Sequence, residues 1–63
     1  MEEIGAVKRL AAMRAVSVDD ATAHFAGARR EIVARHLETL AILGELREGA
    51  DGSYGLSVAA AGV

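Results

Sequence analysis

The stretch ETLAILGELREGADGSYGL, residues 38–56, changes its hydrophobic period at Gly44. Before this glycine the apolar residues recur at helical spacing, whereas after it apolar and polar residues alternate around an Asp-Gly pair. Glycine enters the left-handed conformation that ends many helices, and Asp-Gly between alternating residues is typical of a tight hairpin turn. The stretch therefore predicts a helix that runs into a β-hairpin, whose strands pair across residues 49–52. One face of the second strand is expected to carry Tyr54, Leu56 and Val58.

The helix before Gly44 has the strongest periodicity in the chain. Between about residues 28 and 43, spacings of four and three relate Val33, Leu37 and Leu40, which form an apolar stripe. A step of about 100° per residue assigns the opposite stripe to three charged side chains and one isoleucine. These residues are Glu31, Arg35, Glu38 and Ile42.

Two further helices are predicted upstream. An amphipathic pattern runs from about residue 2 to residue 14, and its apolar side carries Ile4, Val7, Leu10 and Ala11. Ser17 is expected to cap a second helix, because its hydroxyl can accept a hydrogen bond from the backbone N–H of Asp20. That helix is predicted over residues 18–26 and ends at Gly27, with Ala21 and Phe25 toward the core.

The composition indicates a small domain without disulfide bonds or a cysteine-based metal site to stabilise it. The chain has 63 residues, 52% of them apolar, and contains no cysteine, proline or tryptophan. Because much of the apolar fraction is alanine, we expect one mainly helical domain with a thin core over residues 1–58 and a flexible tail over residues 59–63. No stretch reaches the roughly 18 apolar residues that span a membrane. The N-terminus lacks a secretory pattern, and with the absence of cysteine this favours a cytoplasmic location.

The order helix, helix, sharp turn, helix, hairpin resembles the winged helix-turn-helix family over residues 17–56, SVDDATAHFAGARREIVARHLETLAILGELREGADGSYGL. The resemblance implies three helices plus a two-stranded wing, to which Val16 could add a short third strand, and a small regulator that reads duplex DNA. The third helix of that family usually begins with a Ser or Thr cap, where this chain has Ala28. In size and element order the chain also resembles the FeoC-like stand-alone winged helices of bacterial ferrous iron transport. This wing has no cysteine cluster, so no iron-sulfur role is carried over.

The resemblance implies that the helix over residues 28–43 enters the major groove N-terminus first, while the wing over residues 45–57 lies along the DNA backbone. The expected DNA-binding residues are Arg29, Arg30 and Arg35 on the helix and Arg47 and Ser53 on the wing. An arginine fork offers two donors to a phosphate or to a guanine edge. The alternative for Arg35 is an ordinary surface ion pair with Glu31, four residues earlier.

The charge pattern weighs against a DNA-binding surface. Seven Lys and Arg against nine Asp and Glu give a net charge of −2, and Glu48 and Asp51 make the wing acidic. The alternative function is a protein-interaction module or accessory subunit that does not bind DNA. A continuous positive face over the third helix and the wing would favour DNA, whereas an acidic or apolar face would favour a protein partner.

Ile42 and Met13 are candidate residues of a partner interface, because the predicted core faces do not accommodate them. An exposed isoleucine beside an alanine-rich surface indicates a contact within a homodimer or with another protein. The alternative is a single exposed apolar residue, which needs no partner. Tyr54, in contrast, is expected in the core with its hydroxyl at the rim.

Catalytic and metal-binding patterns do not stand out in this chain. His24 and His36 are isolated histidines, for which an ordinary surface position is expected. Nothing resembles a nucleophile elbow, a phosphate-binding glycine loop or paired catalytic carboxylates. The sequence therefore predicts a non-enzymatic protein without a metal or cofactor.

Overall fold

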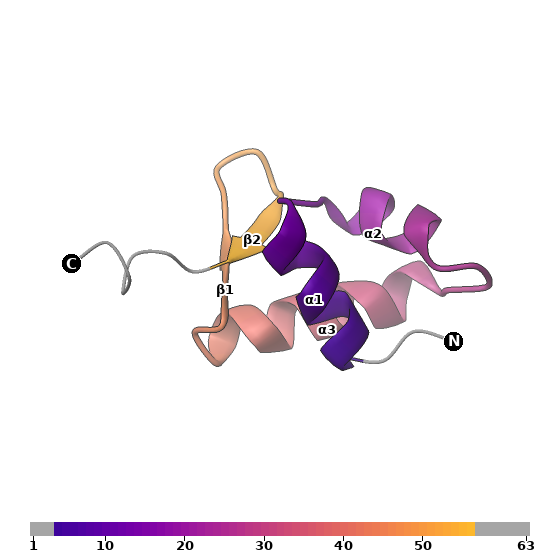
Figure 1. Ribbon diagram of the computed structural model, residues 1–63, viewed down its shortest axis with the longest axis horizontal. Coiled ribbons are helices and arrows are strands. Elements are labelled where there is room, and N and C mark those ends of the chain that lie inside the picture. Colours follow the sequence, from indigo (N-terminus) through magenta and orange to yellow (C-terminus); the bar gives the residue numbers. More distant parts are fainter. Residues whose placement is uncertain (1–3, 57–63) are drawn as a thin grey trace.

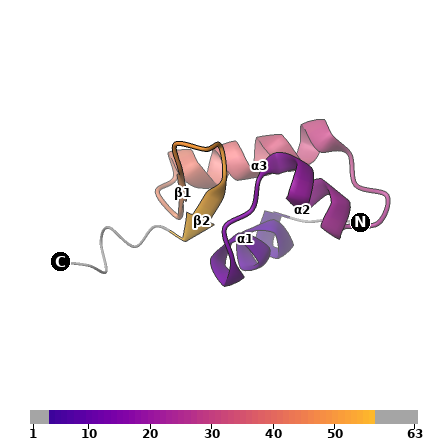
Figure 2. The same cartoon turned by 90° about the horizontal axis from the view of Figure 1, so that it is seen from above.

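The computed structural model describes residues 4–56 as three helices followed by a two-stranded antiparallel hairpin (Figure 1). The helices are α1 (Ile4–Met13), α2 (Val18–His24) and α3 (Arg30–Ile42), and the strands are β1 (Leu46–Glu48) and β2 (Tyr54–Leu56). α1 crosses α3, and from above the two helices lie on opposite sides of the molecule (Figure 2). The mainly helical fold with a small hairpin is thus confirmed, in a layout compatible with a winged helix.

α1 buries the apolar face that the sequence predicts, except at its first residue. Val7 and Leu10 are buried together with Ala11, whereas Ile4 is 39% exposed. Ile4 lies one turn before Val7 on the same side, at the end of α1, where the core stops. Elsewhere on α1, Lys8 forms an ion pair with Glu45 and so joins the helix to the turn that leads into the hairpin. The predicted start of the helix at residue 2 lies outside the described residues.

α2 begins at the predicted cap and ends earlier than predicted. The backbone N–H of Asp20 donates to the Ser17 hydroxyl at 3.1 Å, which confirms Ser17 as the N-cap. The helix stops at His24 because Phe25 adopts an extended conformation, with φ −102° and ψ 116°. This turn places the half-buried Phe25 side chain against the core. Gly27 then takes a positive φ of 76°, as its place in the turn requires.

α3 is shorter at both ends than the predicted range of residues 28–43. Its N-cap is Arg29, whose side chain makes no capping hydrogen bond. At the other end, Gly44 has a φ of 82° and its N–H donates to the Ala41 carbonyl at 3.1 Å, while the Glu45 N–H donates to the Leu40 carbonyl at 2.9 Å. These two bonds form a Schellman motif, which satisfies carbonyl groups that the helix end would leave unpaired. The change of period at Gly44 is therefore a helix C-terminus.

The hairpin has a loop one residue longer than the tightest type. Leu46 pairs with Leu56 and Glu48 with Tyr54, and the Gly49 N–H closes the ladder on the Ser53 carbonyl at 2.7 Å. The Gly52 N–H donates back to the Gly49 carbonyl at 3.0 Å, and Gly52 has a φ of 85°. This pattern matches a three-residue loop, residues 50–52, with a glycine bulge. The Asp-Gly pair thus occupies the last two loop positions.

Ten side chains form the core of the described residues. They are Val7, Leu10, Ala11, Val16, Ala21, Val33, Leu37, Leu40, Leu46 and Tyr54. The predicted stripe of α3 and the predicted burial of Tyr54 are confirmed, but Leu56, expected on the same face, is 50% exposed at the open end of the hairpin. Val58 and the tail over residues 59–63 lie outside the described residues. Within residues 4–56, the helices are too short or too polar to span a bilayer.

Candidate functional site

The start of α3 combines exposed arginines with an uncapped helix end. Arg29 is the N-cap residue and Arg30 the first helical residue, and both are exposed. The Ile32 N–H already donates to the Arg29 carbonyl at 3.0 Å, but the Arg29 side chain makes no capping bond, so the N–H groups of Arg30 and Glu31 remain available to water or to an anion. The partial positive charge of a helix N-terminus adds to the two guanidinium groups. This end of α3 can therefore attract phosphate oxygens.

Arg30 already has an acidic partner. Its Nε donates to Asp19 Oδ1 at 2.6 Å, which links the first turn of α2 to the first turn of α3. Both side chains remain largely exposed, at 65% for Arg30 and 77% for Asp19. Exposed pairs of this kind contribute about 0–1 kcal/mol, so a phosphate oxygen can replace the Asp19 carboxylate at little cost.

The outer stripe of α3 is exposed as predicted, and its charges alternate in sign. Glu31, Arg35 and Glu38 follow one another along the stripe, which ends with Ile42. The ion pairs formed within residues 4–56 are Lys8–Glu45 and Asp19–Arg30, so the alternative pairing of Arg35 with Glu31 is not formed. Of the three helix arginines, Arg35 is the one that lies on the outer stripe.

The hairpin presents one arginine and a serine that is already engaged. Arg47 is exposed on β1 opposite Gly55. The Ser53 hydroxyl donates to Asp51 Oδ1 at 2.7 Å, and the Ser53 N–H donates to the same oxygen at 3.1 Å. These two bonds, the hydroxyl bond first, lower the pKa of Asp51 below its ordinary value of 3.8. A phosphate contact by Ser53 therefore requires its hydroxyl to leave Asp51.

The surface that would face DNA carries more carboxylates than arginines. We call this the α3 surface: it comprises the exposed charged residues of the first turn of α2, of α3 with its N-cap, and of the hairpin. Its four arginines are Arg29, Arg30, Arg35 and Arg47, and its six carboxylates are Asp19, Asp20, Glu31, Glu38, Glu48 and Asp51. Arg29 and Arg30 are thus adjacent at the start of α3, whereas the carboxylates are spread over all three parts of the α3 surface, Asp19 and Glu31 next to these arginines included.

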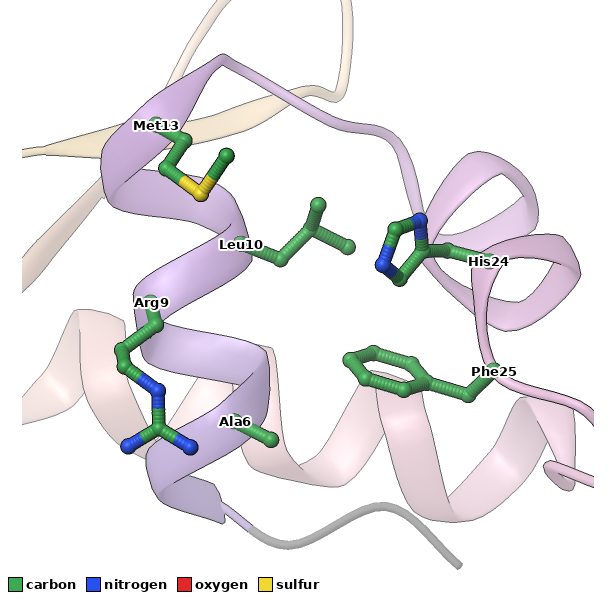
Figure 3. Close-up of a pocket in the computed structure, with 6 residues that line it drawn as sticks. All are labelled: Ala6, Arg9, Leu10, Met13, His24 and Phe25. Carbon is green, nitrogen blue, oxygen red and sulfur yellow. The ribbon is translucent and has the colours of Figure 1, made fainter.

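A groove lies between α1 and the end of α2, and none of its lining residues belongs to α3 (Figure 3). It has a volume of about 240 Å³ and is lined by Ala6, Arg9, Leu10, Met13, His24 and Phe25. The His24 and Phe25 rings meet edge to face, with centroids 5.0 Å apart and an interplanar angle of 85°. Met13, one of the two predicted interface residues, is 81% exposed at this groove. We refer to it as the α1–α2 groove.

Met13 and Ile42 do not form one interface on a single molecule. Ile42 is 85% exposed on the outer stripe of α3, whereas Met13 lines the α1–α2 groove. The sequence predicts an ordinary surface position for His24 and no role for Arg9. No local pattern indicates the groove, because only the packing of α1 against α2 brings its lining residues together.

The described part of the chain lacks the side-chain geometry of a metal site. Across residues 4–56, no three His, Cys, Asp or Glu side chains lie close enough together to hold a metal ion. Comparison with protein families, curated proteins and solved structures finds no match for this chain. The α3 surface and the α1–α2 groove are therefore the features on which a functional interpretation rests.

Proposed function

We propose that this domain is a winged helix that binds duplex DNA with the N-terminal half of α3 in the major groove and the hairpin along the flanking backbone. The order of the elements supports this arrangement, since a third helix followed directly by a hairpin is the layout of that docking mode. The hairpin is held against the helices by the burial of Leu46 and Tyr54. Arg47 on β1 is then the arginine available for the backbone contact.

The exposed, uncapped start of α3 is the observation that carries the proposal. Arg29 and Arg30 flank N–H groups that have no side-chain acceptor, and Arg35 follows on the outer stripe. Helix N-termini and arginine forks are both common phosphate ligands. Their combination favours the N-terminal end of α3, rather than its C-terminal end, as the part that contacts DNA. The Asp19–Arg30 pair is weak enough to exchange for a phosphate contact.

The acidic remainder of the α3 surface weakens this binding, and the arginine–phosphate contacts make it dependent on salt. If Arg29, Arg30 and Arg47 each neutralise one phosphate, the logarithm of affinity falls with a slope of about −2.7 against the logarithm of salt concentration. This corresponds to a loss of about 40-fold in affinity between about 50 and about 200 mM salt. Sequence preference would come from Arg35, since a bidentate contact to guanine discriminates by about 1–3 kcal/mol.

Fluorescence anisotropy with a labelled duplex at about 50 mM salt tests the proposal. We expect saturable binding that is lost when Arg29, Arg30 and Arg35 are all replaced by alanine. Arg14→Ala is the matched control, because Arg14 is an exposed arginine that follows α1 and lies outside the α3 surface. Absence of binding at low salt, or binding that survives the triple substitution, would refute the proposal.

The excess of carboxylates on the α3 surface favours a second candidate function, a module that binds a basic protein surface. Glu31 and Glu38 lie on the outer stripe, which is where a recognition helix would meet its ligand. Replacing both by glutamine separates the two functions. The change should strengthen binding if DNA is the ligand, because two repulsive charges are removed, and should weaken it if the ligand is a basic protein.

A further inference from the structure

The α1–α2 groove has the size of a socket for a side chain. Its volume of about 240 Å³ lies below the range of about 300–1,000 Å³ typical of small-molecule sites. Its walls are largely apolar, formed by Ala6, Leu10, Met13 and Phe25 (Figure 3). A cavity of this kind suits one large apolar side chain from a partner, in the manner of an anchor residue at an interface.

Arg9 gives the groove an electrostatic preference. It is the charged residue among those that line the groove, and it is exposed on α1. An apolar anchor that enters the groove is therefore best accompanied by a carboxylate that reaches Arg9. The ligand chemistry that fits is a large aliphatic side chain with an acidic residue one helical turn away.

The chain itself presents this combination on another surface. Ile42 is 85% exposed, the highest value among its large apolar side chains in the described residues. Glu38 precedes it by four residues on the same exposed stripe of α3, so the two side chains are neighbours on the helix surface. The anchor and its carboxylate are thus both available on a regular helix.

We propose that the α1–α2 groove binds Ile42 of a second copy of this chain, with Arg9 pairing with Glu38 of that copy. The contact joins two different surfaces, so it is heterologous and leaves a free groove and a free Ile42 at the ends of each pair. It involves the last part of α3, whereas Arg30 lies twelve residues before Ile42, at a distance of about 18 Å along the helix axis. The start of α3 therefore stays accessible to DNA in the associated form.

The association is expected to be weak and to depend on concentration. One anchor and one ion pair bury far less than the roughly 1,200–2,000 Å² of a stable interface. Sedimentation velocity should show a monomer at about 10 μM and a rising average mass toward about 1 mM, the range in which such contacts form. A monomer throughout this range would overturn the proposal.

Cysteine cross-linking tests the geometry, because the chain has no cysteine of its own. Under mild oxidation, a mixture of the variants Met13→Cys and Ile42→Cys should form a mixed disulfide about tenfold faster than a mixture of Ala12→Cys and Ile42→Cys. Ala12 is the matched control, since it is exposed on α1 next to Met13 but does not line the groove. Equal rates for the two mixtures, or faster self-linking of Ile42→Cys alone, would overturn the proposal.

A charge reversal tests the ion pair separately. Arg9→Glu and Glu38→Arg should each lower the average mass at high concentration, and the chain that carries both changes should recover it. If the double variant does not recover the average mass, Arg9 and Glu38 do not pair in the interface. The DNA titration is an independent readout, because Arg9 lies outside the α3 surface. Arg9→Glu should therefore change the DNA affinity attributed to Arg29, Arg30 and Arg35 by less than about twofold.

Discussion

Val16 and Tyr54 exchange two backbone hydrogen bonds. The Val16 N–H donates to the Tyr54 carbonyl at 2.9 Å, and the Tyr54 N–H donates to the Val16 carbonyl at 2.7 Å. This isolated one-residue bridge places Val16 beside β2 where a short third strand was expected, but the sheet itself has two strands. Because Val16 lies between α1 and α2, the bridge fixes the hairpin relative to the helices. The position of Arg47 beside α3 therefore depends on Tyr54.

Tyr54→Ala should destabilise the domain severely. The side chain is 5% exposed and contributes to the single core, so its loss leaves a cavity that costs about 3–5 kcal/mol. A domain of this size has a total stability of about 3–9 kcal/mol. We expect urea unfolding followed by circular dichroism to show a variant that is partly or wholly unfolded in water. Tyr54→Phe is the control, which keeps the ring and should lose less than about 1.5 kcal/mol.

Alkaline pH should lower the stability of the domain through the ionisation of Tyr54. Burial, aided by the nearby carboxylates of Glu48 and Glu38, raises the pKa of Tyr54 above its ordinary value of 10.0. Between pH 10 and that higher pKa the folded state binds more protons than the unfolded state, so stability falls as pH rises. The stabilising contribution of Tyr54 is complete well below pH 10 and is lost as pH rises through its raised pKa. Tyr54 is the only tyrosine in a chain without tryptophan, so its ultraviolet absorbance reports the titration directly.

Removal of the phenol group should abolish this alkaline loss of stability. Above pH 10 the urea midpoint of the wild-type protein should fall as Tyr54 ionises. The midpoint of Tyr54→Phe should lack this fall, because the variant has no phenol group to ionise. A wild-type tyrosine that titrates at or below pH 10.0 would contradict the raised pKa of Tyr54 and the desolvation that causes it.

Gly44→Ala should destabilise the domain without a steric clash. A Cβ at Gly44 would meet no atom within 4 Å, so the cost comes from the φ of 82° alone and amounts to about 1–2 kcal/mol. Gly5→Ala is the matched control, because Gly5 lies in α1 without a positive φ and its added Cβ would lie 3.6 Å from an Arg9 nitrogen, an ordinary contact. That control should gain up to about 1 kcal/mol. Thermal melts that shift in the same direction for both variants would contradict the Schellman assignment.

The features that the sequence predicted correctly have local causes. Gly27 and Gly44 adopt positive φ because their neighbours in the chain require a turn there. Ser17 caps α2 through a bond to a residue three positions away. The burial of Val33, Leu37 and Leu40 follows from helical geometry once one face meets the core. Each of these can be read within a single turn or helix.

The features that were missed depend on contacts between elements. Phe25 ends α2 because its ring gains more by packing on the core than by extending the helix, and helix propensity does not contain that gain. Asp19 and Arg30 pair across eleven residues, so no spacing rule predicts their bond. The α1–α2 groove exists only after two helices have packed. The bonds from Ser53 to Asp51 are different, because they span two residues of one loop, a local pattern common for Asp in turns, and were missed although the sequence contains that spacing.

Asp19→Asn should increase DNA affinity if the start of α3 is the binding end. The change removes a carboxylate and releases the Arg30 guanidinium from its 2.6 Å bond. We expect tighter binding by about 3- to 10-fold, which corresponds to about 0.7–1.4 kcal/mol. Asp20→Asn is the matched control: it removes the same charge from the same first turn of α2 but releases no arginine. Equal gains for the two variants would mean that Arg30 takes no part in binding.

The Asp51–Ser53 contact predicts how the hairpin loop responds to acid. The Ser53 hydroxyl and N–H both donate to Asp51 Oδ1, and they hold the pKa of Asp51 below 3.8. Between that lowered pKa and 3.8 the unfolded state binds more protons, so the contribution of Asp51 is complete above pH 3.8 and is lost as pH falls through the lowered value. Carbon NMR of the carboxyl group can follow this titration at the residue itself.

Ser53→Ala should move the pKa of Asp51 upward, toward 3.8, because it removes the hydroxyl bond, the largest cause of the shift, and keeps the backbone bond. Ser57→Ala is the matched control, a serine removed four residues along the chain, and should leave that pKa in place. The same variants bear on DNA binding: since the Ser53 proton is already donated to Asp51, Ser53→Ala should not lower affinity by more than about twofold. A larger loss would show that Ser53 leaves Asp51 to bind a phosphate, and would restore it to the DNA-binding residues.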